Sequence, residues 1–130
     1  MGHPFEATSS QILGAAVEVH RALGPGFLEK TYSQALRVAL EMRGVPYAAE
    51  CEVPLTFAGR SVGSYRIDLV VAGQVVVELK AVRRFEELHF AQVRAYLRAT
   101  GLQAGLLLNF NAPVLAVKRV VRGRNEGPLE

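Results

Sequence analysis

The chain has 130 residues and a mass of 14.1 kDa, which fits one domain, and 50% of its residues are apolar, which excludes a disordered chain. No apolar run approaches the roughly 18–20 residues that span a bilayer, so a transmembrane helix is excluded. The formal net charge of +3 and the pI of about 9.4 allow a polyanionic partner without requiring one, and the single cysteine excludes an internal disulfide and a cysteine-rich zinc site.

Two helices are predicted at the start of the chain. Thr8 and Gln11 have the spacing of a capping box, and an apolar stripe at helical period follows over residues 9–23. His20 falls on this stripe, which favours a buried structural histidine over a ligand. A Gly-Pro-Gly sequence ends the first helix, and the apolar pattern returns over residues 28–43. We therefore expect two consecutive helices that bury one face each.

Three strands are predicted next, at residues 51–57, 62–71 and 75–82. Apolar and polar residues alternate along the first two, and turns containing glycine separate all three. The second and third strands are close enough in the chain to form a hairpin. Cys51 stands at a half-buried position of the first strand, and we interpret it as a structural thiol rather than a nucleophile.

One more helix and two strands complete the pattern. Residues 86–100 are predicted to be helical. Residues 104–109 are almost continuously apolar, as in a strand that is buried on both faces, and Asn109 is expected to form hydrogen bonds at its end. Residues 114–121 form the last strand, which is placed at an edge of the sheet because it carries adjacent basic residues. The order of elements predicts an α/β fold.

Three charged residues lie inside the most apolar stretch of the sequence. Asp68 belongs to one strand of the predicted hairpin, and Glu78 and Lys80 belong to the other. Charged groups in such a place are costly unless they pair with one another or with a metal. Because side chains alternate along a strand, Glu78 and Lys80 share one face, and pairing of the strands brings Asp68 beside them.

Two interpretations of this trio stand side by side. A Mg²⁺ ion would relieve the repulsion between the two carboxylates, with the backbone carbonyl of Leu79 as a further oxygen ligand. Lys80 would then reach toward the attacking water or a scissile phosphate. In the second interpretation the residues are a buried ion pair without chemistry, although such pairs contribute little net stability. Spacing alone does not separate the two.

The order of these residues resembles that of the PD-(D/E)xK nuclease superfamily. Asp68 is followed after nine residues by Glu78-x-Lys80, and a helix bearing Glu29 precedes them. Gln92 and Tyr96 in the next helix have the Q-x-x-x-Y spacing of the RecB-like and Cas4-like branch. Along nearly the whole chain the sequence is also similar to the small GxxExxY family, whose motifs match Gly26-Phe27-Leu28-Glu29-Lys30-Thr31-Tyr32, Val77-Glu78-Leu79-Lys80-Ala81-Val82 and Leu106-Leu107-Leu108-Asn109-Phe110.

The resemblance implies a fold and a site. The fold is a restriction-endonuclease-like core over residues 1–130, with a mixed central sheet of about five strands flanked by helices. The activity is phosphodiester hydrolysis that depends on Mg²⁺ or Mn²⁺. The metal ligands implied are Asp68, Glu78, Leu79 and Glu29. The catalytic residues implied are Asp68, Glu78, Lys80, Gln92 and Glu29. His89 shares a helix face with Gln92 and Tyr96, and a phosphate contact and a structural role are equally compatible with its position.

A nucleic acid is the partner that this resemblance implies, with DNA favoured over RNA. The expected contacts are Arg83, Arg84, Tyr96, Lys118 and Arg119, joined by Arg122 and Arg124 in a C-terminal basic cluster. The small size of the chain favours a homodimer, since oligomers gain substrate-binding surface. The single cysteine and the lack of a secretory pattern at the N-terminus favour the cytoplasm.

Two alternatives remain. The chain could be a catalytically silent module that keeps the fold and binds nucleic acid or a partner protein. It could also hydrolyse another phosphodiester, such as RNA or a nucleotide signal.

Overall fold

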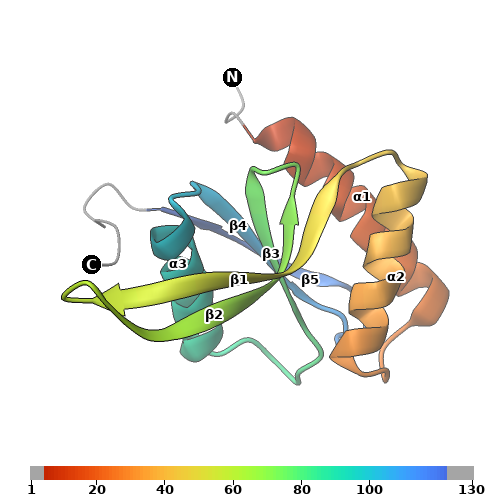
Figure 1. Ribbon diagram of the computed structural model, residues 1–130. Helices are drawn as coiled ribbons and strands as arrows, with labels where there is room; N and C mark the ends of the chain where they lie inside the picture. The colour runs from red at the N-terminus through yellow and green to blue at the C-terminus, as the bar shows by residue number, and fades with distance from the viewer. Residues whose placement is uncertain (1–4, 123–130) are drawn as a thin grey trace.

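The elements follow the predicted order along the chain. The computed structural model describes residues 5–122. Within them lie three helices and five strands (Figure 1), with the bounds α1 (Glu6–Leu23), α2 (Glu29–Met42), β1 (Tyr47–Phe57), β2 (Arg60–Val71), β3 (Val75–Lys80), α3 (Glu87–Thr100), β4 (Ala104–Asn109) and β5 (Ala116–Val121). No helix in this part of the chain combines the length and apolarity needed to cross a membrane.

The five strands form one mixed sheet in the order β1-β2-β3-β4-β5. All neighbouring strands are antiparallel except β3 and β4, which are parallel and are connected through α3. A parallel pair needs such a crossover, because a tight turn cannot join strands that run in the same direction. The predicted mixed sheet flanked by helices is therefore confirmed, as is the position of β5 at an edge.

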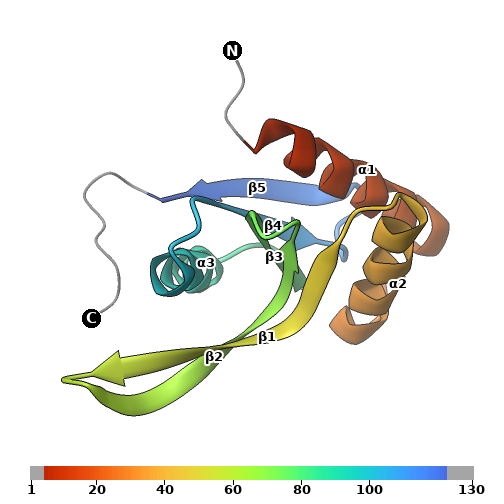
Figure 2. The ribbon, with the colours of Figure 1, turned by 45° about the horizontal axis from the view of Figure 1, so that its top comes forward.

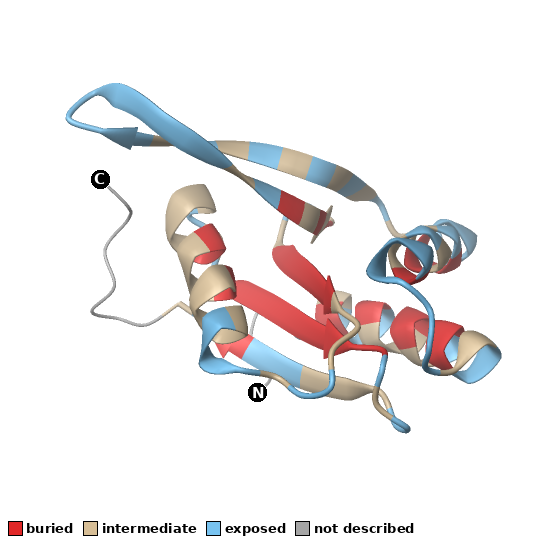
Figure 3. Cartoon of the chain, turned by 90° about the horizontal axis from the view of Figure 1, so that it is seen from below, coloured by how far each residue is buried: buried red, intermediate tan, exposed pale blue. Residues whose placement is uncertain are grey.

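The two faces of the sheet carry different helices, as Figure 2 shows. Helices α1 and α2 cover one face with a core that includes Ile12, Leu36, Val77 and Leu106. Helix α3 covers the other face with a smaller core that includes Val76, Val93, Leu97 and Leu107. Consecutive residues of β3 and β4 thus alternate between the two cores, which is why both strands read as continuous apolar runs. Figure 3 shows these central strands buried and the tip of the β1–β2 hairpin exposed.

The long β1–β2 hairpin changes its position relative to the sheet along its length. Leu69 packs in the core under α1 and α2, whereas Ile67, two residues earlier on the same strand, packs in the core under α3. Residues two apart in a flat strand would face the same core. The hairpin therefore twists strongly between them, at Asp68, and its tip extends past α3 (Figure 1).

Some boundaries differ from the prediction. The capping box of Thr8 and Gln11 is wrong, since α1 begins at Glu6 and its N-cap residue Phe5 makes no side-chain cap hydrogen bond. The Thr8 hydroxyl instead donates to Oε1 of Gln74 at 2.6 Å, a partner in the turn between β2 and β3. Strand β1 begins four residues before the predicted position, at Tyr47.

Strand β3 ends at Lys80, two residues before the predicted end. Beyond this end, the side chain of Asn109 forms the hydrogen bonds that a neighbouring strand would otherwise form with the backbone of Val82. Its Oδ1 accepts from the Val82 N–H at 3.0 Å, and its Nδ2 donates to the Val82 carbonyl at 2.8 Å. This confirms the prediction of a hydrogen-bonding residue at the end of β4. The contact anchors the segment that follows Lys80.

Candidate active site

Strand β3 carries only apolar side chains on the face toward α1 and α2, whereas the face toward α3 carries Val76 followed by the charged residues Glu78 and Lys80. Glu78 is only 4% exposed, and its Oε2 lies 3.4 Å from Nζ of Lys80. The Lys80 side chain is itself only 14% exposed. Glu78 and Lys80 share a face, as their spacing predicts, and this face is the one that α3 covers.

Asp68 lies across from Glu78 on the neighbouring strand. The pairing of Leu69 with Val77, extended by one residue, sets Asp68 opposite Glu78. Oδ2 of Asp68 accepts a hydrogen bond from the Leu79 backbone N–H at 2.9 Å. That bond ties the carboxylate to the backbone of β3. The structure thus brings together the three residues that the sequence singled out.

The surroundings of Glu78 disfavour its charged form. The pKa of Glu78 rises from 4.5 to about 8, first because burial removes water from the carboxylate and second because the negative charge of Asp68 is close. The positive charge of Lys80 lowers this pKa but does not cancel the other two effects. In the described part of the chain, Oε1 of Glu78 is buried without a hydrogen-bond partner. A buried carboxylate oxygen without a partner is unusual and points to a ligand that would bind there.

This environment fits a hard divalent cation. Two carboxylates that repel each other, one with a free buried oxygen, would both be stabilised by a positive ion between them. Among residues 5–122, no three His, Cys, Asp or Glu side chains are close enough to form a metal site by themselves. Asp68 and Glu78 are therefore the pair that could hold the ion, with other ligands coming from backbone, water or substrate.

Glu29 approaches from the other side of Asp68. It is exposed, is the first residue of α2, and lines a pocket of about 430 Å³ together with Asp68. The loop before it is held by Tyr32, which is fully buried and whose hydroxyl donates to the Gly24 carbonyl at 2.5 Å and accepts from the Phe27 N–H at 3.1 Å. The ring of Tyr32 also stacks on Phe110 at 4.7 Å. Tyr32 therefore positions Glu29 rather than acting in the site itself.

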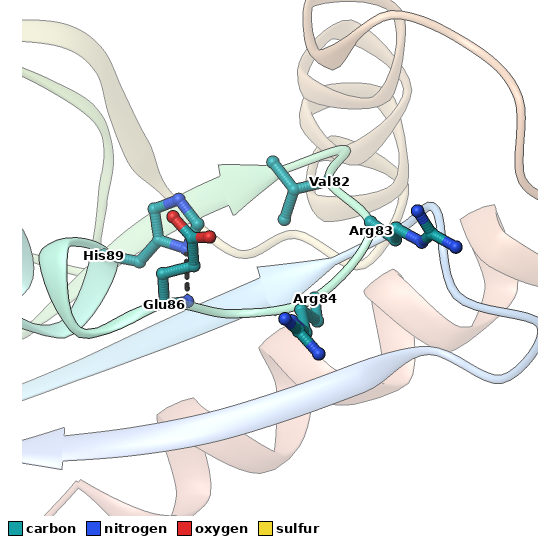
Figure 4. A pocket seen from close by; sticks show the side chains of 5 residues that line it. All are labelled: Val82, Arg83, Arg84, Glu86 and His89. Atoms are coloured by element: carbon teal, nitrogen blue, oxygen red, sulfur yellow. Dashed lines mark hydrogen bonds between the residues drawn. The ribbon is translucent and has the colours of Figure 1, made fainter.

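His89 has a structural role at the start of α3. Its Nδ1 accepts from the Glu86 N–H at 3.0 Å, and the Glu86 side chain accepts from the His89 N–H, which completes a capping box. Figure 4 shows this pair beside a pocket of about 570 Å³ that Val82, Arg83 and Arg84 also line. Both arginines are exposed, and their side chains extend away from the His89 ring (Figure 4). They are free to contact a substrate beyond the end of β3.

Gln92 and Tyr96 lie on the face of α3 that meets the trio. Gln92 and Lys80 line a largely apolar pocket of about 460 Å³. Tyr96 is only 3% exposed, so the predicted nucleic-acid contact at this ring does not fit the structure. Burial and the negative charges of Glu78 and Asp68 raise its pKa, while a hydrogen bond with Gln92 acts in the opposite direction. Tyr96 therefore keeps its proton and packs behind the site.

Tyr65 is a residue at this site that the sequence did not single out. Its ring meets the ring of Tyr96 edge to face, with centroids 5.1 Å apart, and it lines the same pocket as Lys80 and Gln92. Tyr65 is half-buried, so it is the aromatic ring that a substrate could reach. Its position three residues before Asp68 on the same strand is the feature of the sequence that could have pointed to it. Only the twist of the hairpin, however, brings Tyr65 over α3.

The predicted C-terminal basic cluster is divided between the two faces of the sheet. Lys118 and Arg119 are both exposed, and they pair with Leu107 and Leu106, which belong to different cores. Lys118 is in the same row as Glu78, two strands away, or about 10 Å at ~4.8 Å per strand. Arg119 faces the side of α1 and α2. Arg122 follows β5 and donates to the Gly101 carbonyl at 3.4 Å, and Arg124 lies outside the described residues.

Comparisons with known proteins give matches to a family model and to a solved structure. A family model described as "PD-(D/E)XK nuclease superfamily" matches residues 6–120. The crystal structure of the protein SSO0001 is similar over 97% of this chain, with a TM-score of 0.59 and 19% sequence identity, a likeness that concerns the fold alone. The chain spans 61% of the length of that protein. No match is found among curated protein sequences.

Proposed function

The chain belongs to the PD-(D/E)XK nuclease superfamily, and from this membership we propose that it is a nuclease that hydrolyses phosphodiester bonds in DNA with the help of Mg²⁺ or Mn²⁺. One observation carries the proposal. Glu78 is buried beside a second carboxylate, has a raised pKa, and keeps Oε1 without a partner among the described residues. A buried ion pair offsets the cost of desolvation only when its remaining oxygens are also hydrogen-bonded, which, within the described chain, is not so for Oε1 of Glu78.

Asp68 and Glu78 are the proposed metal ligands, and the backbone carbonyl of Leu79 is the third. Glu29 lines the same pocket as Asp68 but does not form a three-carboxylate group with Asp68 and Glu78. We assign it a contact through water from the N-terminus of α2. A bound Mg²⁺ would lower the pKa of a coordinated water and offset the negative charge that develops on the phosphate.

Lys80 is the residue proposed to contact the attacking water and the scissile phosphate. Its ammonium is held 3.4 Å from the Glu78 carboxylate and is largely buried, so its charge is poorly screened by solvent. In this position it orients the attacking water and stabilises the charge on the phosphate oxygens. Gln92, which lines the pocket next to Lys80, positions this side chain or a phosphate oxygen. Tyr96 holds the Gln92 side chain in place through their hydrogen bond.

The substrate is proposed to run past the carboxyl end of β3. Arg83 and Arg84 are exposed directly after this strand, and Lys118 projects from the same face of the sheet. Such contacts bind the nucleic-acid backbone without reading the sequence. Arg119 on the opposite face would contact only a substrate that bends around the edge of β5. A homodimer remains part of the proposal, since a second subunit would extend this small basic surface.

A cleavage assay tests the function. The chain is incubated with single-stranded DNA, double-stranded DNA and RNA in the presence of Mg²⁺, Mn²⁺ or EDTA. We expect cleavage of DNA that EDTA abolishes and that Glu78→Gln and Lys80→Ala reduce strongly. Glu52→Gln is the control, because Glu52 is an exposed acid on β1 outside the site. Equal cleavage by all variants would refute the assigned residues, and DNA binding without cleavage in any condition would favour a silent module.

A further inference from the structure

A second cluster of charges lies on the α2 side of Asp68. The pocket that holds Asp68 and Glu29 is also lined by Arg37 from α2, Glu50 from β1 and Arg66 from β2. None of these three residues takes part in the chemistry assigned above. Arg37 and Arg66 place two positive charges in the same pocket as Asp68.

Glu50 bridges the two arginines, but loosely. Its Oε2 lies 3.7 Å from a terminal guanidinium nitrogen of Arg37, and its Oε1 lies 3.5 Å from one of Arg66. Charge-assisted hydrogen bonds are shorter, about 2.7–2.9 Å. The Glu50 side chain is also 52% exposed, so it can leave the arginines without breaking other packing. This bridge is therefore one that a better anion can replace.

Arg37 has an unused donor. Its side chain is only 17% exposed, and its Nε is buried with no acceptor among residues 5–122. Arginine binds planar or tetrahedral oxygen groups with several N–H donors at once, and phosphate supplies enough acceptors for both guanidinium groups. The unpartnered Nε shows that Glu50 does not satisfy this guanidinium, and it points to a ligand with more oxygens.

The backbone at Glu50 is unusual as well. Its φ is 51°, in the left-handed region that few residues other than glycine adopt. Glu50 lies opposite Asp68, since its neighbours pair as Ala49 with Leu69 and Cys51 with Ile67. The backbone positions of Glu50, Asp68 and Glu78 therefore form a row across β1, β2 and β3, while the Glu50 side chain lies in the pocket on the α2 side. The negative charge of Glu50 disfavours the binding of a nucleic acid, so we expect this residue to have a role in the free protein.

We propose that Arg37 and Arg66 form a binding site for a substrate phosphate adjacent to the scissile one, and that Glu50 occupies this site in the free protein as a replaceable anion. The inference rests on the proposed nuclease function, since it assigns the position of the substrate in that same site. The phosphate displaces the Glu50 carboxylate into solvent and gains both guanidinium groups. Glu50 thus weakens binding of any anion that cannot engage both arginines.

Fluorescence anisotropy tests this phosphate site. The binding of short fluorescein-labelled DNA, single-stranded and double-stranded, is measured in EDTA over a range of NaCl concentrations. We expect Glu50→Gln to tighten binding about threefold to tenfold, and more than Glu6→Gln, which removes the same charge from an exposed residue of α1 outside the pocket. Arg66→Gln should weaken binding about threefold to tenfold. It should also reduce the slope of log K against log salt by about 0.9 on double-stranded DNA and about 0.7 on single-stranded DNA, the loss of one phosphate contact. Arg60→Gln at the tip of the hairpin is its control.

Three results would overturn the proposal: equal effects of Glu50→Gln and Glu6→Gln, an unchanged salt slope for Arg66→Gln, or no measurable binding of the parent chain to either DNA. Arg66 is 68% exposed, so its replacement tests the site even if Arg37→Gln fails to fold. Because the assay contains no metal, its outcome is independent of cleavage. If the parent chain cleaves DNA but the two variants bind DNA as the parent does, only this phosphate site is refuted. If the variants alter binding but the parent chain does not cleave, only the proposed activity is refuted.

Discussion

The two faces of strand β3 show how one short segment serves both stability and chemistry. Val75, Val77 and Leu79 point into the core under α1 and α2, where each is at most 1% exposed. Glu78 and Lys80 point to the other face, where a charged pair and an unsatisfied oxygen replace apolar packing. Burial of the apolar side chains on the first face stabilises the folded state, whereas burial of the charged pair on the second face costs stability.

The comparison teaches that the site depends on a rigid apolar support. A carboxylate with a raised pKa remains buried only where the surrounding structure prevents it from turning to solvent. The alternation of side chains along β3 provides this, because the residues on either side of Glu78 are locked in the opposite core. Substitutions on the two faces are therefore expected to separate activity from stability.

The largest effect is expected at Glu78. Glu78→Gln should lower cleavage by about 10³-fold, because a lost metal ligand removes several kcal/mol of transition-state stabilisation. The free energy of unfolding should stay equal or rise, because the variant no longer carries a carboxyl group whose ionised form is disfavoured by burial and by the charge of Asp68. Cleavage kinetics and urea unfolding measure the two quantities. A large loss of stability would mean that Glu78 supports the fold rather than the chemistry.

The same carboxyl group should make stability depend on pH. Its pKa is near 4.5 in the unfolded chain and about 8 in the folded one, so folding takes up a proton between these values. The stabilising contribution is complete below about pH 4.5 and is lost as the pH rises through about 8, and a full shift of this size corresponds to a few kcal/mol at ~1.4 kcal/mol per unit. Urea unfolding in EDTA at a series of pH values measures it. In Glu78→Gln this part of the pH dependence should disappear.

On the apolar face, Leu79→Ala should cost about 3 kcal/mol of unfolding free energy, since it leaves a cavity in the core under α1 and α2. Its backbone N–H still binds Asp68, so cleavage per folded molecule should change by less than about threefold, or under ~0.7 kcal/mol. Val77→Ala, farther from the site on the same face, is the matched variant. A loss of cleavage in Leu79→Ala alone would contradict the separation of the two faces.

A smaller effect is expected where α3 touches the sheet. An added Cβ at Gly105 would lie 2.7 Å from Cγ1 of Val93 and 3.4 Å from the Val76 carbonyl, so Gly105→Ala must displace α3. We expect a loss of about 1–3 kcal/mol in stability. Cleavage should also fall, because Gln92 moves with the helix. Ala104→Gly, which adds no volume, should leave cleavage per folded molecule unchanged, and equal kinetics in the two variants would show that the distance of α3 from β3 does not matter.

Local patterns determined the order of elements and the central trio. The period-two alternation of β3 fixes which residues share a face, so Glu78 and Lys80 could be placed together from their spacing. The apolar run of β4 and the role of Asn109 at its end follow from the same kind of reasoning. These features depend on residues that are close in the chain, and steric rules between neighbours apply to them in any fold.

Contacts between distant segments decided the rest. The hydroxyl of Thr8 pairs with a residue 66 positions away and not within its own helix, and Tyr96 is buried by the hairpin that crosses α3. The cluster of Arg37, Glu50 and Arg66 joins one helix and two strands, and no local period relates its members. Burial, pKa and ion pairing depend on which surfaces meet, and only the packed sheet with its two layers of helices determines that.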